Sequence, residues 1–124
     1  MLPQKKILVV EDNLLNREML VDILADYYLV LEAGNGQEAL EILKEHQDDI
    51  ALILLDIVMP VKDGIDATRE ILAIDPHATV IIVSSVGTQM QLKKAIEAGA
   101  KDFIQKPIEM DQLRTLIQTH LGGQ

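Results

Sequence analysis

The chain has 124 residues, 48% of them hydrophobic, which fits one folded globular domain. Its 20 acidic and 11 basic residues give a net charge of -9, which argues against nucleic acid or an anionic membrane as a direct partner. The absence of cysteine excludes disulfides, a thiolate nucleophile and cysteine-based metal sites. Because neither a secretory signal nor an apolar run of roughly 20 residues is found, we expect a cytoplasmic protein.

Short β-rich runs alternate with amphipathic helical patterns along the chain. The expected strands are Lys6–Val10, Tyr28–Leu31 continued by Glu32 and Ala33, Ile50–Leu55, Val80–Ser84 and Asp102–Gln105. The helical stripes are, in chain order, Leu15, Met19, Leu20, Ile23 and Leu24; Ala39, Leu40 and Leu43; Ile65, Thr68, Ile71 and Leu72; Leu92, Ala95, Ile96 and Gly99; and Leu113, Leu116 and Ile117. We interpret all five stripes as core and Gly122-Gly123 as the stop of the last helix.

Three of the expected strands are almost continuously apolar, which is typical of parallel strands covered on both faces. Five βα units in series therefore predict a doubly wound α/β fold with a parallel sheet, built as one domain over residues 1–124. We expect no output domain in this chain. In such sheets the functional crevice lies beyond the carboxyl ends of the strands.

Polar residues stand at the ends of four of these strands. The first strand runs into Glu11 and Asp12, the third into Asp56, the fourth into Ser84 and Ser85, and the fifth into Lys106. A complementary set at one sheet edge is a stronger signal of function than any single polar residue.

The residue types indicate a particular chemistry. Carboxylates clustered without histidine or cysteine suit a hard cation such as Mg²⁺, with Mn²⁺ as an alternative. A carboxylate beside that ion and a lysine can attack phosphorus as a nucleophile, and we assign this role to Asp56. Lys106 then offsets phosphoryl charge while Ser84 donates a hydrogen bond.

Structural explanations compete with these assignments. Glu11, Asp12 and Asn13 could simply start a helix, because Asp and Asn are good N-caps. Lys106 could be a solvated surface residue and Ser84 a turn residue. We interpret the three histidines, which are His46, His77 and His120, as surface residues.

The sequence closely resembles the receiver domain of two-component response regulators. Its C-terminal half looks most like single-domain chemotaxis regulators, whereas its N-terminal VEDNLLNREML looks more like receivers attached to hybrid kinases. The matching segments are ILVVEDN at 7–13, AGNGQEAL at 33–40, LLDIVMPVKDG at 54–64, VIIVSS at 80–85 and AIEAGAKDFIQKP at 95–107. This resemblance implies a flavodoxin-like (βα)5 three-layer sandwich with strand order 2-1-3-4-5. It also implies phosphorelay signalling by a protein that accepts phosphate without being a turnover enzyme.

The resemblance implies a role for each matched residue. Asp56 matches the phosphoacceptor, whose donor is a histidine kinase or a histidine phosphotransfer protein. Glu11 and Asp12 match the acidic pair that holds Mg²⁺ together with Asp56 and the backbone carbonyl of Val58.

Three further positions match the switch machinery of the family. Lys106 matches the phosphate-contacting lysine, and its bond to Pro107 resembles one that is cis in relatives. Ser84 matches the switch hydroxyl and Phe103 the switch aromatic, for which a core role is the alternative. Phosphorylation would then shift the surface of the fourth helix, fifth strand and fifth helix toward an unknown downstream protein.

Two apolar residues depart from many relatives. Val58 and Val86 stand two positions past Asp56 and Ser84, where fast-cycling members often carry polar residues that orient water. We therefore predict slow self-dephosphorylation. Ser85 replaces a common alanine and adds a second hydroxyl, which blurs the identity of the switch residue.

Other functions are compatible with parts of the pattern. A phosphate-independent pseudo-receiver is disfavoured by the intact set of polar residues. A haloacid-dehalogenase-like phosphatase would require a second Asp where this chain has Val58. An FMN binder would require a Ser/Thr/Gly-rich loop where the chain reads EDNLLN.

Receivers often pair through their last two helices, so we expect a monomer or a phosphorylation-dependent dimer. The polar residues suited to such contacts, which are solvated in the simpler view, are Lys93, Lys94, Lys101 and Asp102.

Overall fold

The computed structural model describes residues 6–46, 49–57, 63–84 and 89–121. Five parallel strands form one sheet in the order β2-β1-β3-β4-β5, as expected. The strands are β1 (Lys6–Val10), β2 (Leu29–Ala33), β3 (Ile50–Asp56), β4 (Val80–Ser84) and β5 (Asp102–Gln105). The helices are α1 (Leu14–Ala25), α2 (Gly36–Glu45), α3 (Gly64–Ile74), α4 (Gln89–Ala98) and α5 (Met110–Leu121).

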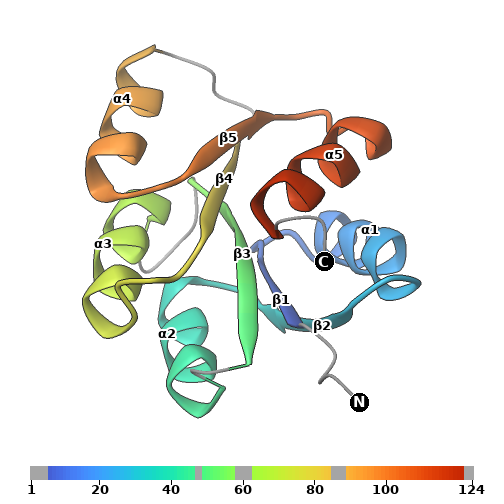
Figure 1. The fold of residues 1–124 in the computed structure, drawn as a ribbon, viewed down its shortest axis with the longest axis horizontal. Helices are drawn as coiled ribbons and strands as arrows, with labels where there is room; N and C mark the ends of the chain where they lie inside the picture. The colour runs from blue at the N-terminus through green and yellow to red at the C-terminus, as the bar shows by residue number, and fades with distance from the viewer. Residues whose placement is uncertain (1–5, 47–48, 58–62, 85–88, 122–124) are drawn as a thin grey trace.

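Helices cover both faces of the sheet and make three layers (Figure 1). Because side chains alternate between the two faces of the sheet, each central strand contributes residues to two hydrophobic cores. Leu8, Val10, Ile53 and Leu55 pack with α2, α3 and α4, whereas Ile7 and its neighbours in register pack with α1 and α5. The doubly wound fold class is therefore confirmed.

Side-chain caps fix where three helices begin. Asn13, Asn35 and Asp63 each accept hydrogen bonds from backbone N–H groups in the first turn of α1, α2 and α3. The cap of α1 is thus Asn13, which leaves the carboxylates of Glu11 and Asp12 available at the strand end. No helix in the described part of the chain is long and apolar enough to cross a membrane.

The predicted core stripes are partly wrong on α1 and α4. Leu15 and Met19 are 66% and 55% exposed, whereas Leu20 and Leu24 are buried. The exposed stripe lies about 100° round the helix from the buried one, because each residue turns the helix by that angle. Ile96 on α4 is likewise 56% exposed, beside buried Ala95.

Small corrections concern the ends of elements. β2 begins at Leu29 instead of Tyr28, and β3 extends one residue further, to Asp56. Gly99 lies just beyond α4 with φ of 113°, a left-handed conformation that suits glycine at a helix end. The expected stop at Gly122-Gly123 lies outside the described residues.

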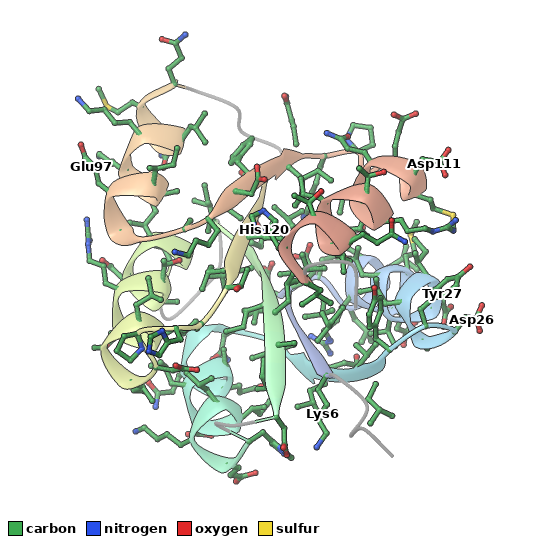
Figure 2. All side chains as sticks on the ribbon, viewed as in Figure 1. Lys6, Asp26, Tyr27, Glu97, Asp111 and His120 are labelled. Carbon is green, nitrogen blue, oxygen red and sulfur yellow. The ribbon has the colours of Figure 1, made fainter. Side chains whose placement is uncertain are left out.

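A cation–π contact joins α5 to the turn that follows α1. The Arg114 guanidinium on α5 lies 5.2 Å from the ring centroid of Tyr27, two residues beyond the end of α1. Figure 2 shows Tyr27 on the α1 side of the layer formed by α1 and α5. This cation–π contact is mostly exposed and contributes roughly 0.5–1 kcal/mol.

Candidate functional site

Three carboxylates meet at the carboxyl ends of β1 and β3. Val10 pairs with Leu55 in the sheet, so the next residues, Glu11 and Asp56, lie side by side on neighbouring strands. One ligand oxygen from each of Glu11, Asp12 and Asp56 lies within 4.8 Å of the others. Glu11 and Asp56 are buried and Asp12 is exposed, so the cluster opens to solvent on one side.

Lys106 reaches this cluster from the other end of the chain. It follows β5, and its Nζ lies 2.5 Å from Glu11 Oε1 and 3.1 Å from Asp56 Oδ2. Burial by itself lowers the pKa of Lys106, but the hydrogen bond to Glu11 and the charge of Asp56 outweigh it and raise the pKa overall. Lys106 is therefore a charged member of the site rather than a solvated surface lysine. Its peptide bond to Pro107 is cis, as the resemblance implied.

Ser84 ends β4 beside this centre, whereas Phe103 lies further back on β5, where it pairs with Ile82. Ser84 is fully buried one residue beyond Val83, which pairs with Asp56 across the sheet. Its carbonyl accepts a hydrogen bond from the Lys106 N–H at 2.9 Å, which ties the end of β5 to the end of β4. Phe103 is half-buried and packs against the core beneath α2, α3 and α4.

The N-terminus of α3 packs closely against the backbone of Asp56 and Ile57. The Gly64 N–H donates to the Ile57 carbonyl at 2.7 Å. A Cβ on Gly64 would lie 2.3 Å from the Asp56 carbonyl oxygen, so only glycine permits this approach. The buried Thr68 hydroxyl in turn donates to the Gly64 carbonyl at 2.7 Å.

Some sequence assignments fall on residues that the structure does not describe. Val58, with its implied carbonyl ligand, lies outside the described residues, as do Ser85 and Val86. The prediction of slow self-dephosphorylation therefore rests on the sequence alone.

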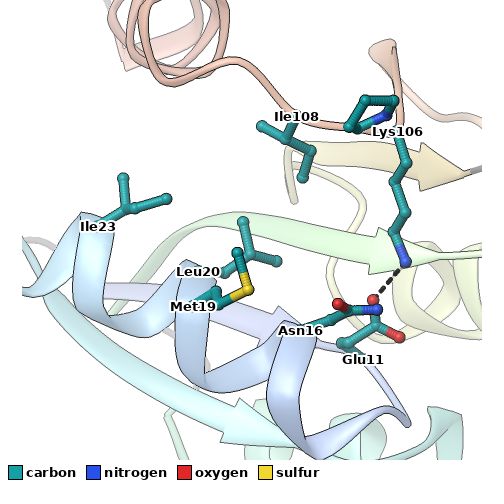
Figure 3. A pocket seen from close by; sticks show the side chains of 8 residues that line it. Glu11, Asn16, Met19, Leu20, Ile23, Lys106 and Ile108 are labelled. Carbon is teal, nitrogen blue, oxygen red and sulfur yellow. Dashed lines mark hydrogen bonds and ion pairs between the residues drawn. The ribbon is translucent and has the colours of Figure 1, made fainter.

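An apolar groove adjoins the acidic cluster between α1 and the segment that follows β5 (Figure 3). It has a volume of about 450 Å³, and Glu11 and Lys106 stand at its polar end. The remaining lining residues are Asn16, Met19, Leu20, Ile23, Pro107 and Ile108. Met19, from the exposed stripe of α1, lines one wall together with buried Leu20 and half-buried Ile23.

The predicted surface histidines differ in their surroundings. His77 is exposed, but His120 on α5 is half-buried and its Nε2 lies 3.0 Å from Asp102 Oδ2 (Figure 2). His46 Nδ1 lies 3.9 Å from Asp49 Oδ2. Asp102 therefore contacts a residue of α5. Lys93, Lys94 and Lys101 are exposed, in agreement with the interpretation that they are solvated.

Sequence reasoning missed Arg17 on α1. Its Nη1 donates to the Glu11 carbonyl at 2.9 Å, and its Nε lies 3.2 Å from Glu32 Oε1. The local pattern marks Arg17 only as a polar helix residue, so no signal in the sequence connects it with the strand end.

The geometry suits a hard cation held by oxygen ligands beside a nucleophilic carboxylate. Converging oxygens from three acids, one of them exposed, fit a divalent metal site, because the ion would remove their mutual repulsion. An ammonium shared by two buried carboxylates provides a second positive charge. Together these groups can stabilise a transferring phosphoryl group.

Comparison with known proteins agrees with this geometry. Residues 7–118 match the response regulator receiver domain. The chain is 48% identical over 107 residues to the chemotaxis protein CheY of Thermotoga maritima, covering 85% of this chain and 88% of that protein. It is 44% identical over 119 residues to CheY of Bacillus subtilis, covering 94% and 98%.

Solved structures give the same result. A response regulator receiver domain protein from Clostridium thermocellum superposes with a TM-score of 0.90 at 31% identity, covering 95% of this chain and 94% of that one. A chain of the CheX-CheY-BeF3-Mg²⁺ complex from Borrelia burgdorferi gives 0.88 at 30%, covering 93% and 87%. CheY-like receivers are signalling proteins rather than turnover enzymes. The chain belongs to the response regulator receiver family.

Proposed function

We propose that this response regulator receiver accepts a phosphoryl group on Asp56 from a phosphohistidine of a sensor kinase or phosphotransfer protein. The observation that carries the proposal is the convergence of Lys106 with Glu11, Asp12 and Asp56 at one sheet edge. In a phosphate-independent pseudo-receiver we would expect at least one of these four charged residues to be replaced.

The transfer follows from the chemistry of the groups. A carboxylate oxygen of Asp56 attacks phosphorus and forms an O–P bond while the N–P bond to the donor imidazole breaks. The leaving imidazole nitrogen keeps the electron pair and takes up a proton. Lys106, 3.1 Å from the nucleophile, offsets charge on the phosphoryl oxygens.

The acidic cluster would hold Mg²⁺, with Mn²⁺ as a substitute, through Glu11, Asp12 and Asp56. The resemblance to receiver domains further implies the backbone carbonyl of Val58 as a ligand. When bound, the ion supplies positive charge that lowers the barrier to phosphoryl transfer. The Borrelia burgdorferi CheY complex that contains BeF3 and Mg²⁺ supports this assignment by analogy.

Phosphorylation would be transmitted through Ser84 and Phe103. Ser84 would donate to a phosphoryl oxygen, and movement of its loop would let the half-buried Phe103 change rotamer. The surface of α4, β5 and α5 would then bind a downstream protein or a second copy. This change biases two existing conformations and requires no new fold.

The groove between α1 and the β5–α5 segment would contribute to donor binding. A donor imidazole must reach Asp56, so its protein must cover surface around the site. Met19 is apolar, is 55% exposed and lines the groove, whose polar end holds Lys106. We expect Met19→Lys to slow transfer from a protein donor while leaving transfer from acetyl phosphate unchanged, with Lys94→Met on exposed α4 as the control.

The deciding experiment is intact-protein mass spectrometry after incubation with acetyl phosphate or a phosphorylated kinase. We expect a Mg²⁺-dependent gain of one phosphoryl group, which is absent in Asp56→Asn. Failure with both donors would favour the phosphate-independent alternative. A gain that persists in Asp56→Asn would instead assign the chemistry to another residue.

Decay of the phosphoryl signal tests a further proposal. Because Val58 and Val86 cannot hydrogen-bond an attacking water, we expect the aspartyl phosphate to outlast that of fast-cycling receivers. Val58→Asn should shorten its lifetime, and a wild-type lifetime of seconds would contradict the proposal.

We further propose one domain over 1–124 and a cytoplasmic location.

A further inference from the structure

We propose that Arg17 is a positioning residue for the metal-binding acids, and this inference rests on the proposed magnesium site. In this proposal Arg17 acts on the backbone, not on the nucleophile or the phosphoryl group. Its guanidinium instead donates to the backbone carbonyl of Glu11 at 2.9 Å. That carbonyl belongs to the peptide that joins Glu11 to Asp12, so one hydrogen bond sets the orientation of the link between two of the three acids.

The Glu11 backbone is held from both sides. Its N–H donates to the Ala33 carbonyl on β2 at 3.1 Å, and its carbonyl accepts from Arg17 on α1. Its carboxylate bonds Lys106 through Oε1 and lies 3.4 Å from the Asn13 N–H through Oε2. Without Arg17 the peptide loses its anchor to α1, while the N–H anchor to β2 remains.

Arg17 is itself fixed by its surroundings. Its side chain is 19% exposed, and Nε lies 3.2 Å from Glu32 Oε1 on the edge strand β2. A Cβ on Gly34 would lie 3.1 Å from Arg17 Nη1, so the guanidinium sits close over that glycine. The planar fork of arginine can bond a carboxylate and a carbonyl at the same time, which a lysine ammonium does less well.

Electrostatics and positioning predict opposite effects when Arg17 is removed. Loss of a positive charge near an acidic cluster should, by Coulomb's law alone, strengthen binding of a divalent cation. Loss of an outer contact that orients the ligands should weaken binding, by about tenfold in typical sites. The sign of the change therefore separates the two explanations.

The test is Mn²⁺ binding followed by electron paramagnetic resonance, with Mg²⁺ competition, on wild type and Arg17→Met without any phosphoryl donor. We expect about tenfold weaker binding by Arg17→Met. Glu32→Gln removes the ion pair but keeps the carbonyl bond, and its affinity should change less than about twofold. Arg69→Met, an exposed arginine paired with Asp66 at 3.2 Å, should bind like wild type.

Equal or tighter binding by Arg17→Met overturns the inference. So does equal weakening in Glu32→Gln, which would assign the effect to general loss of the α1–β2 contact. Absence of binding by wild type would refute the magnesium site as well, and is distinguished by that control. Circular dichroism checks folding; should Arg17→Met prove unfolded, Arg17→Lys keeps the charge without the fork and must also bind more weakly.

Discussion

Replacing Gly64 by alanine tests how closely α3 must approach the phosphoacceptor strand. The added Cβ would lie 2.3 Å from the Asp56 carbonyl oxygen and 2.7 Å from the Ile57 Cα. Ordinary contacts of this kind begin at about 3.4 Å, so backbone must shift by about an ångström. Both contacts are to backbone, which has no rotamer by which to avoid the methyl group.

The magnitude follows from two effects. Overpacking of this kind destabilises by about 1–3 kcal/mol. The same shift weakens the 2.7 Å hydrogen bond from the Gly64 N–H to the Ile57 carbonyl, which contributes about 1 kcal/mol. Alanine restricts the unfolded chain and returns less than about 1 kcal/mol. We expect a net loss of roughly 1–3 kcal/mol in the free energy of unfolding.

Urea unfolding followed by circular dichroism measures this loss. Gly34→Ala is the matched control, because the atoms nearest to its Cβ would be the movable ends of the Arg17 and Glu38 side chains. We expect that variant to change stability by less than about 1 kcal/mol. Because the displaced atoms include the Asp56 peptide, Gly64→Ala should also accept phosphate from acetyl phosphate at least about tenfold more slowly. Wild-type stability and wild-type phosphorylation in Gly64→Ala would refute the reasoning.

Three further outcomes are expected. Lys106→Met leaves the carboxylates of Glu11 and Asp56 adjacent without a cation. The free energy of unfolding measured in urea without metal should therefore fall by about 3 kcal/mol, and millimolar Mg²⁺ should restore part of it. An equal loss with and without Mg²⁺ would contradict this expectation. The folded-state pKa of Lys106 lies above its ordinary 10.5, because its carboxylate partners outweigh the effect of burial. Its contribution is therefore complete below 10.5 and lost as the pH rises through the folded-state value, so the stability difference between wild type and Lys106→Met should shrink at alkaline pH; a constant difference would count against the pair. Thr68→Val removes the buried hydroxyl that bonds the Gly64 carbonyl and should cost about 1 kcal/mol in urea unfolding, whereas no loss would show that bond to be neutral.

The sequence predicted the sheet and the polar strand ends well because both depend on local pattern. The apolar run before Asp56 had to be a buried strand, and parallel strands bring their carboxyl ends to one edge. Glu11, Asp56 and Lys106 consequently meet where expected, although 95 positions separate the first from the last.

Other features depend on the angle at which elements pack, which no local pattern encodes. The stripe of Leu15 and Met19 has helical spacing like a core stripe, but α1 turns its Leu20 and Leu24 to the sheet instead. Arg17 carries no motif, and only the position of α1 beside β2 brings its guanidinium to Glu11. The groove arises from the same packing.

The bridge from Lys106 to Glu11 has a consequence for synthesis of the chain. A ribosome makes β1 and its acids first, but the lysine belongs to a segment made after nearly all of the others. A growing chain from which Asp56 has already emerged still lacks the Lys106 ammonium until β5 has also emerged from the ribosome and paired with β4. Partly made protein should therefore be a poor phosphate acceptor, and signalling competence would be acquired only when the outermost strand docks.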